Sequence, residues 1–170
     1  MRARLALIGC ALMLSACTLR PLYSGGAQGP VASALSGVEV APIPGRGGWL
    51  VRTALQDRLG ASGSGRVVYR LEVALDDSIT GFGIRSDDAV TRERRTLRAR
   101  YRLVDATRGT VLLDATAGSD AGVDVVSSEY ATVAAEQTAL ERLSVEVAEQ
   151  IVSRIALYAA RTRRAPATGE

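Results

Sequence analysis

Residues 89–105 read AVTRERRTLRARYRLVD, in which two kinds of side chain alternate. Leucine, alanine and tyrosine occupy every second position from Leu97 to Leu103, and arginine fills most positions between them. Because successive side chains of a β-strand point to opposite faces, this pattern predicts a long strand with one buried and one polar face. A sheet built from such strands needs an apolar cover on one side only.

The segments on either side share this period of two. Residues 67–76 alternate in the same way, and residues 110–119 are expected to pair back on 89–105 after a turn at Asp105–Gly109. Residues 79–84 are expected to continue as an extended segment broken by Gly81 and Gly83. Residues 120–126 are compatible with either strand or loop. A short edge strand is expected at 38–43, ending at a proline.

Two segments have helical spacing. The first is Trp49–Leu59, preceded by a turn at Gly45–Gly48 and ended by Gly60. The second is the long segment Glu129–Ala160, for which about 1.5 Å per residue gives a helix of roughly 48 Å. Its expected apolar stripe consists of Val133, Leu140, Leu143, Val147, Ile151, Ile155 and Tyr158.

The element order predicts an α+β two-layer sandwich, with about four mostly antiparallel strands packed against two helices. We expect one such domain over residues 37–160. The polar, proline-containing segment 161–170 is expected to be a disordered tail.

The first residues have the pattern of a lipoprotein signal peptide. Arg2 and Arg4 precede an apolar run too short to span a bilayer, and Ser15-Ala16-Cys17 follows. By resemblance to bacterial lipoproteins, residues 1–16 would be removed and Cys17 would carry a diacylglycerol and an N-acyl chain such as palmitate. Residues 17–36 would then be a flexible tether to a membrane. The alternative is an ordinary signal peptide with a chance cysteine.

Composition argues against several classes of function. The chain has no histidine and no lysine, and its two cysteines fall in or directly after the signal, so we expect no enzyme, cofactor or metal centre. The acidic pairs at 76–77 and 87–88 lack the spacing of a calcium loop. Loss of Arg2 and Arg4 from a chain with 21 basic and 18 acidic residues leaves it nearly neutral, which argues against nucleic-acid binding.

One face of the 89–105 strand carries a row of like charges. We call Arg92, Arg94, Arg98, Arg100 and Arg102 the arginine row. Arginine is suited to bidentate phosphate recognition, so the row is a candidate site for an anionic glycolipid or a partner. The alternative is a solvated face on which Glu72, Asp76 and Asp114 of neighbouring strands neutralise the arginines.

Residues 17–23, Cys-Thr-Leu-Arg-Pro-Leu-Tyr, resemble the mature N-terminus of the LPS-assembly lipoprotein family LptE, which in many alphaproteobacteria reads Cys-Gly-Phe-Arg-Pro-Leu-Tyr. Thr18 and Leu19 depart from that pattern. The strand and helix layout agrees over the whole mature chain.

The resemblance implies an outer-membrane lipoprotein that faces the periplasm. It would assemble with and plug the β-barrel LptD and aid lipopolysaccharide transport to the outer leaflet. In that setting the arginine row would meet lipid A phosphates. The alternatives are an auxiliary lipoprotein of an ABC-type lipid transport system and a structural envelope lipoprotein.

Overall fold

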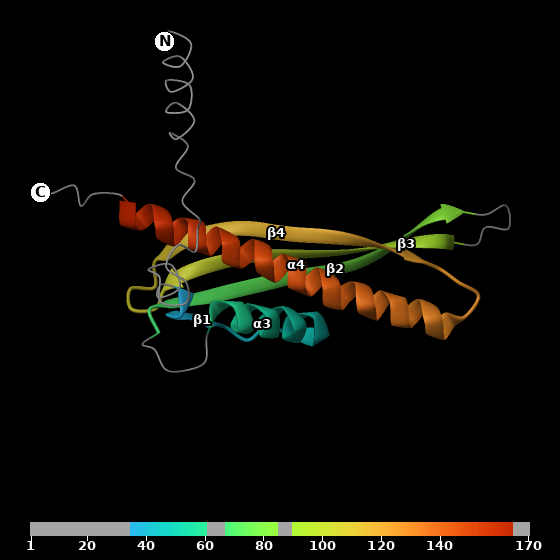
Figure 1. Ribbon diagram of the computed structural model, residues 1–170, viewed down its shortest axis with the longest axis horizontal. Helices are drawn as coiled ribbons and strands as arrows, with labels where there is room; N and C mark the ends of the chain where they lie inside the picture. Colours follow the sequence, from blue (N-terminus) through green and yellow to red (C-terminus); the bar gives the residue numbers. More distant parts are fainter. Residues whose placement is uncertain (1–34, 61–66, 85–89, 165–170) are drawn as a thin grey trace, which may run out of the picture.

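The computed structural model describes residues 35–60, 67–84 and 90–164 (Figure 1). These residues form four strands and two long helices. In chain order they are β1 (Val38–Val40), α3 (Gly45–Leu59), β2 (Tyr69–Ile84), β3 (Val90–Asp105), β4 (Val111–Asp124) and α4 (Glu129–Arg164). The expected α+β fold is confirmed. Cys17, the signal and most of the tether lie outside the described residues.

The four strands form one sheet in the order β1-β2-β3-β4. β1 pairs parallel with the start of β2 only, from Val38 opposite Tyr69 to Val40 opposite Leu71. The other two pairings are antiparallel, and they place Leu97 opposite Asp77 on one side and Ser119 on the other. Most of the sheet is therefore a long antiparallel meander.

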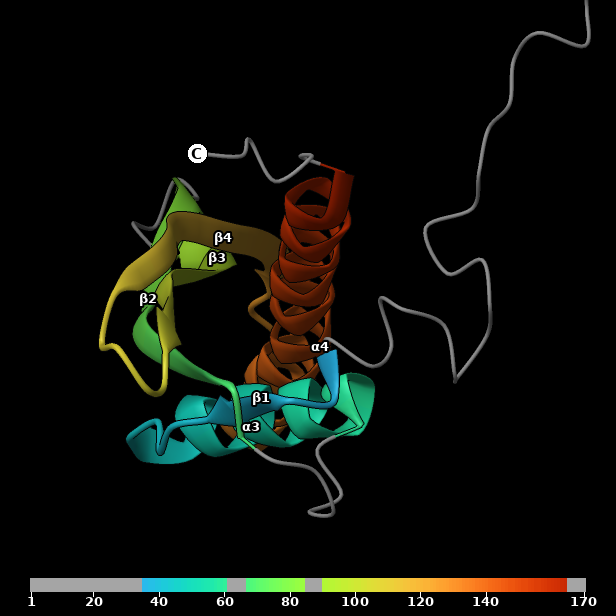
Figure 2. The same cartoon turned by 90° about the vertical axis from the view of Figure 1, so that its left-hand side faces the viewer.

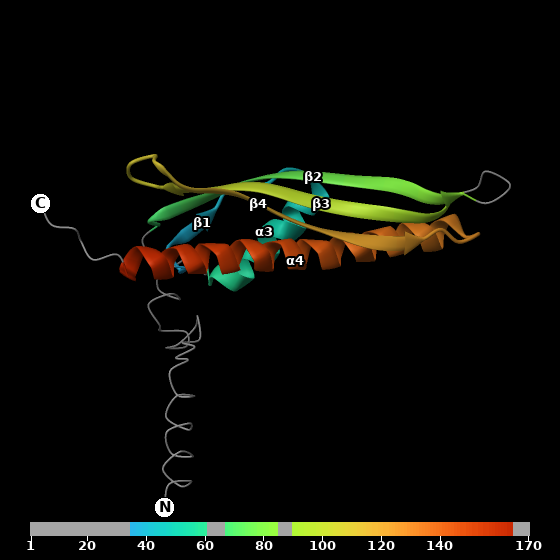
Figure 3. The same cartoon turned by 90° about the horizontal axis from the view of Figure 1, so that it is seen from above.

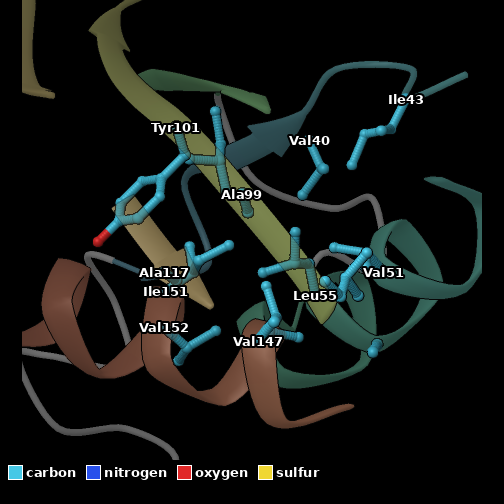
Figure 4. Close-up of a cluster of buried hydrophobic side chains, with 14 of the residues drawn as sticks. Val40, Ile43, Val51, Leu55, Ala99, Tyr101, Ala117, Val147, Ile151 and Val152 are labelled. Carbon is cyan, nitrogen blue, oxygen red and sulfur yellow. The ribbon is translucent and has the colours of Figure 1, made fainter. Parts of the chain in front are cut away.

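Both helices lie on the same side of this sheet, and α4 runs along its length as a second layer (Figures 2 and 3). The inward side chains of β3 from Leu97 to Leu103 are almost fully buried there. They meet the α4 residues Val147 and Ile151 and, from α3, Val51 and Leu55 (Figure 4). The two-layer sandwich follows from a sheet with one apolar face.

Helix α3 begins at Gly45, so the turn predicted at Gly45–Gly48 is wrong. Pro44 has an extended backbone and precedes the first helical residue. Gly48 packs against the backbone of Ile43, where an added Cβ would lie 2.5 Å from the carbonyl oxygen. Gly48 therefore allows close packing of the helix start on Ile43.

Strands β2 and β4 are longer than the sequence predicted. β2 runs without interruption to Ile84 because β3 pairs with it as far as Ile84 opposite Val90. Gly83, with a φ of 77°, does not end the strand. Residues 120–124, which the sequence left open, continue β4 opposite the arginine-rich start of β3.

The ends of the folded domain also differ from expectation. Leu35, which the sequence assigned to the tether, is buried in the core, so the domain begins before residue 37. Helix α4 continues to Arg164, and the first four residues of the expected tail are therefore helical.

At the other end of α4, Val133 is 42 % exposed and does not belong to the buried stripe. Thr132 and Ala139 are buried there instead.

Candidate functional site on the open face of the sheet

The side of β2, β3 and β4 that faces away from the helices is polar, and we call it the open face. The arginine row occupies its centre, on β3, with all five arginines exposed. Positions two residues apart on one strand lie about 6.5–7 Å from each other, so five like charges form a continuous strip. The structure thus brings the predicted site residues together on one surface.

Four of the five arginines have an acidic neighbour on an adjacent strand. Arg102 donates to Glu72 of β2 at 2.9 Å, and Arg92 donates to Asp124 of β4 at 2.9 Å. Arg94 is 3.8 Å from Asp120 and also lies over the Phe82 ring, 5.4 Å from its centroid. These pairs are exposed, and each contributes at most about 1 kcal/mol to stability. They largely neutralise the strip without covering it.

The fourth pair has two contacts. Nε and Nη2 of Arg100 donate to the two carboxylate oxygens of Asp114, at 3.3 and 3.1 Å. These hydrogen bonds lower the pKa of Asp114, with a smaller contribution from the charges of Arg100 and Arg102, and burial opposes the shift. The same hydrogen bonds raise the pKa of Arg100. Both groups therefore remain charged over the physiological range.

Arg98 differs from the other four because it forms no ion pair with any residue in the described part of the chain. It lies between Asp76 of β2 and Gly118 of β4 in the register. Gly118 leaves room beside its stem, since an added Cβ would lie 3.4 Å from Arg98 Cγ. Of the arginine row, Arg98 is the guanidinium most readily available to an anionic ligand.

Two shallow depressions flank Arg100. One, of about 380 Å³, is bounded by Glu72, Ala74, Arg100 and Arg102. The other, of about 440 Å³, has Asp76, Arg98, Thr116 and Gly118 among its lining residues and includes Gln150 of α4 at its rim. Small side chains between the arginines create these depressions. They present guanidinium donors on an open surface, which suits the binding of anionic groups. Neither depression is an enclosed cavity.

The sheet also carries a partly buried polar cluster on its helix side, which the candidate site residues did not include. Nε and Nη2 of Arg95 donate to both oxygens of Asp77, at 2.9 and 2.6 Å. Nη1 of Arg95 reaches α4 and donates to the carbonyl of Glu136 at 2.9 Å. The sequence did indicate that Arg95 points toward the helices, because it lies two residues before Leu97 and so shares a face with Leu97 and Ala99.

Next to this cluster, Glu93 faces Glu136. Burial raises the pKa of Glu93, and the nearby charge of Glu136 and a hydrogen bond to its carboxyl raise it further. One oxygen of Glu93 is inaccessible to solvent and lacks a hydrogen-bonding partner of good geometry among the described residues. The two carboxyl groups therefore join the tip of the β2–β3 hairpin to the start of α4 in a way that depends on protonation.

A small, mainly apolar pocket lies at the opposite end of the sheet, between Tyr69, Leu103, Ile155 and Tyr158. Its volume is about 100 Å³, well below the roughly 300–1,000 Å³ of typical ligand sites. A lipid chain does not fit inside this pocket as it stands. The part of the chain that the structure describes contains no helix long and apolar enough to cross a membrane and no group of three residues placed to hold a metal ion.

The fold is similar to that of several solved bacterial lipoproteins. A protein described as a lipoprotein from Caulobacter crescentus CB15 superposes with a TM-score of 0.65 at 28 % identity, covering 81 % of this chain and all of that one. The rare lipoprotein B from Shewanella oneidensis superposes with a TM-score of 0.58 at 10 % identity, covering 75 % and 98 %. A minor lipoprotein from Acinetobacter baumannii gives 0.55 at 16 % identity, covering 72 % and 92 %. The last two show the fold alone.

The family is identified by sequence. The model of the family LptE, Lipopolysaccharide-assembly, matches residues 35–155, which include every strand and most of α4. This chain therefore belongs to the LptE lipopolysaccharide-assembly family. No curated protein sequence matches it.

Proposed function

We propose that this protein is an outer-membrane lipoprotein, anchored through Cys17 on the periplasmic side, that assembles with the LPS-assembly β-barrel LptD. In this proposal it occupies part of the barrel lumen and aids lipopolysaccharide transport to the outer leaflet. The observation that carries the proposal is the family match over residues 35–155. Acylation of Cys17 at two positions would provide stable anchoring, whereas one chain binds a membrane only marginally.

The surface of the domain is compatible with this role. The lumen of a large outer-membrane barrel is polar, so a protein inside it needs polar outer faces. The open face meets this requirement, because its arginines and acids alternate across three strands. The helices supply further exposed charge, including Arg46 and Glu141, which form an ion pair at 3.7 Å.

The arginine row is the proposed contact for lipopolysaccharide phosphates. Arginine binds phosphate through paired N–H donors, and Arg98 and Arg100 border the same depression. Because four of the arginines already have acidic partners, a phosphate would have to compete with carboxylates for them. Arg98 forms no ion pair in the described chain, although Asp76 lies opposite it in the register, so we place the first phosphate contact there.

Affinity purification tests the assembly. The full chain with a C-terminal tag is expressed in its own host, outer membranes are solubilised gently, and the co-purified proteins are identified by mass spectrometry. We expect a large β-barrel in about one-to-one ratio. Recovery of inner-membrane transporter subunits, or of no partner, would contradict the proposal. Separation of inner and outer membranes in the same cells tests the localisation.

A further inference from the structure

Among the described residues, no strand pairs with the edge of β2 beyond β1. Tyr69 N–H donates to the carbonyl of Gly37, and Leu71 C=O accepts from the N–H of Ala41. The backbone N–H and C=O groups of odd-numbered β2 residues therefore point toward β1. β1 ends at Val40, opposite Leu71. The pairing of β2 with β3 has no bulge from Tyr69 to Phe82, so the same alternation continues along the strand. Beyond β1, the odd-numbered residues therefore point their N–H and C=O groups away from the sheet.

Three of these residues lie in the half of β2 furthest from β1. Asp77, Ile79 and Gly81 form no backbone hydrogen bond outside their own sheet with any described residue. Every residue from Asp76 to Phe82 is exposed, although the segment contains Ile79 and Phe82, which are 42 % and 40 % exposed. From Ser78 to Phe82 no side chain carries a charge. We call residues 77–82 the free edge.

The opposite edge of the sheet is protected. On β4 the even-numbered residues point outward, and the side-chain amide of Gln150 occupies both groups of Gly118, accepting from its N–H at 3.2 Å and donating to its C=O at 3.1 Å. Asp114, Asp120 and Asp124 add charge along that strand. Proteins protect edge strands in these ways because an uncharged, extended edge pairs readily with another strand. The free edge lacks this protection.

We propose that the free edge is a docking site that accepts an extended strand of the β-barrel partner, through main-chain hydrogen bonds from Asp77, Ile79 and Gly81. This inference rests on the proposed function, and it names the surface by which the complex forms. Strand addition of this kind obtains affinity from the backbone and selectivity from the side chains on either face. Here Ile79 would contact the added strand on the helix side of the sheet, and Phe82 on the open face.

The size of the free edge favours a larger partner over a second copy of this chain. Six residues of strand span about 20 Å, and a sheet edge is roughly 10 Å thick, which gives about 200 Å² of contact on each side. Stable complexes bury about 800 Å² per partner. Two copies that pair through this edge alone therefore fall well short, whereas a barrel that surrounds the domain adds the remaining area elsewhere.

The test compares three variants of the full-length, C-terminally tagged protein, each expressed beside the untagged chain. Ile79→Pro removes an outward N–H and keeps the hydrogen bonds to β3. Gly122→Pro is the matched control, since it removes an outward N–H from the protected edge, where an added Cβ has open space. Ile79→Ala removes the side chain and keeps the N–H. The readout is the amount of barrel recovered per tagged protein, with circular dichroism melting of each purified variant.

We expect Ile79→Pro to reduce barrel recovery about tenfold or more and Ile79→Ala to reduce it less, while Gly122→Pro stays within about threefold of the unmodified protein. If the unmodified protein and Ile79→Pro recover the barrel equally, the proposed function stands and the strand addition is overturned. If the unmodified protein recovers no barrel, the proposed function fails, and this inference fails with it.

Two further measurements cover the remaining cases. If Ile79→Pro fails to fold, a photo-crosslinking amino acid at Thr80 of the otherwise unmodified protein replaces it. An adduct with the barrel supports the proposal, and absence of the adduct overturns it. Light scattering of the purified protein tests self-pairing. A dimer that Ile79→Pro dissociates would make a second copy the occupant and would overturn the assignment to the barrel.

Discussion

At the scale of single residues, the arginines of β3 have different environments according to the face of the strand on which they lie. Arg95 directly follows Arg94, yet its side chain is only 12 % exposed and bridges β2 to α4. The side chain of Arg94 is 60 % exposed on the open face. The sequence predicted which arginines share a face, because that depends on parity alone. Of the carboxylates that the sequence suggested as partners, Glu72 and Asp114 do form ion pairs, and Asp76 forms none with a described residue. The pairs with Asp120 and Asp124 were missed, because they depend on the register between strands.

Arg95 should therefore contribute more to stability than the exposed arginines. Replacing it by methionine keeps much of the apolar stem but leaves the Asp77 carboxylate, 31 % exposed, without its partner and the Glu136 carbonyl without a donor. We expect the free energy of unfolding to fall by about 1–3 kcal/mol. The measurement is urea denaturation followed by circular dichroism. Arg92→Met removes an exposed pair and should cost less than about 1 kcal/mol; equal losses would contradict the argument.

Glu93 predicts a pH dependence. Its pKa is raised in the folded state by burial and by Glu136, so the folded protein binds this proton more tightly than the unfolded chain does. Stability associated with Glu93 is thus present at low pH, and it is lost as pH rises from the ordinary value near 4.5 through the raised one. Arg95 and Asp77 are the other charged groups nearby.

Glu93→Gln removes this titration. We expect the variant to be more stable than the unmodified protein at pH 7 and to lose that advantage near pH 4, in urea denaturation at both values. Glu39→Gln, at an exposed position of β1, is the matched control for the loss of one carboxylate. A Glu93→Gln advantage that did not depend on pH would show that the carboxyl pair is not responsible.

At the scale of secondary-structure elements, α3 shows where local sequence preferences fail. Glycine is the weakest helix former apart from proline, so Gly45-Arg46-Gly47-Gly48 indicated a turn. The chain is nevertheless helical there, and at Gly48 the helix start lies so close to Ile43 that a larger side chain would clash. The strands were predicted more accurately, because burial of one face imposes a period of two that glycines at 81 and 83 did not erase.

The two neighbouring glycines of α3 should respond to alanine in opposite directions. At Gly48 the added Cβ would lie 2.5 Å from the carbonyl oxygen of Ile43, so the backbone must shift, and we expect a loss of about 1–3 kcal/mol. At Gly47 the Cβ would make an ordinary contact with Leu140 at 3.6 Å, and the better helix propensity should add up to about 1 kcal/mol. Thermal melting of the two variants measures both signs. A stabilised Gly48→Ala would contradict the close packing.

At the scale of the whole molecule, the apolar core and the charged surface lie on opposite faces of the sheet. The layer between sheet and helices holds the apolar core (Figures 3 and 4). The open face holds the arginine row. The sequence predicted this division and the fold class, because both follow from periodicity. The free edge of β2 could not be predicted, since it depends on β1 being only three residues long and on the strand order.

The same division allows a charge-matched test of lipopolysaccharide binding. Changing Arg94, Arg98 and Arg100 to alanine removes three cations from the open face, while changing Arg46, Arg142 and Arg154 removes three from the helices. If the arginine row holds phosphates, only the first variant should lose affinity, by about tenfold or more, and the loss should shrink as salt increases. Titration of the purified variants with lipopolysaccharide, followed by fluorescence, measures this at two salt concentrations. Equal losses in both variants would mean that net charge, and not the arrangement of arginines on the sheet, determines binding. Unchanged affinity in the variant of Arg94, Arg98 and Arg100 would exclude the arginine row as the contact.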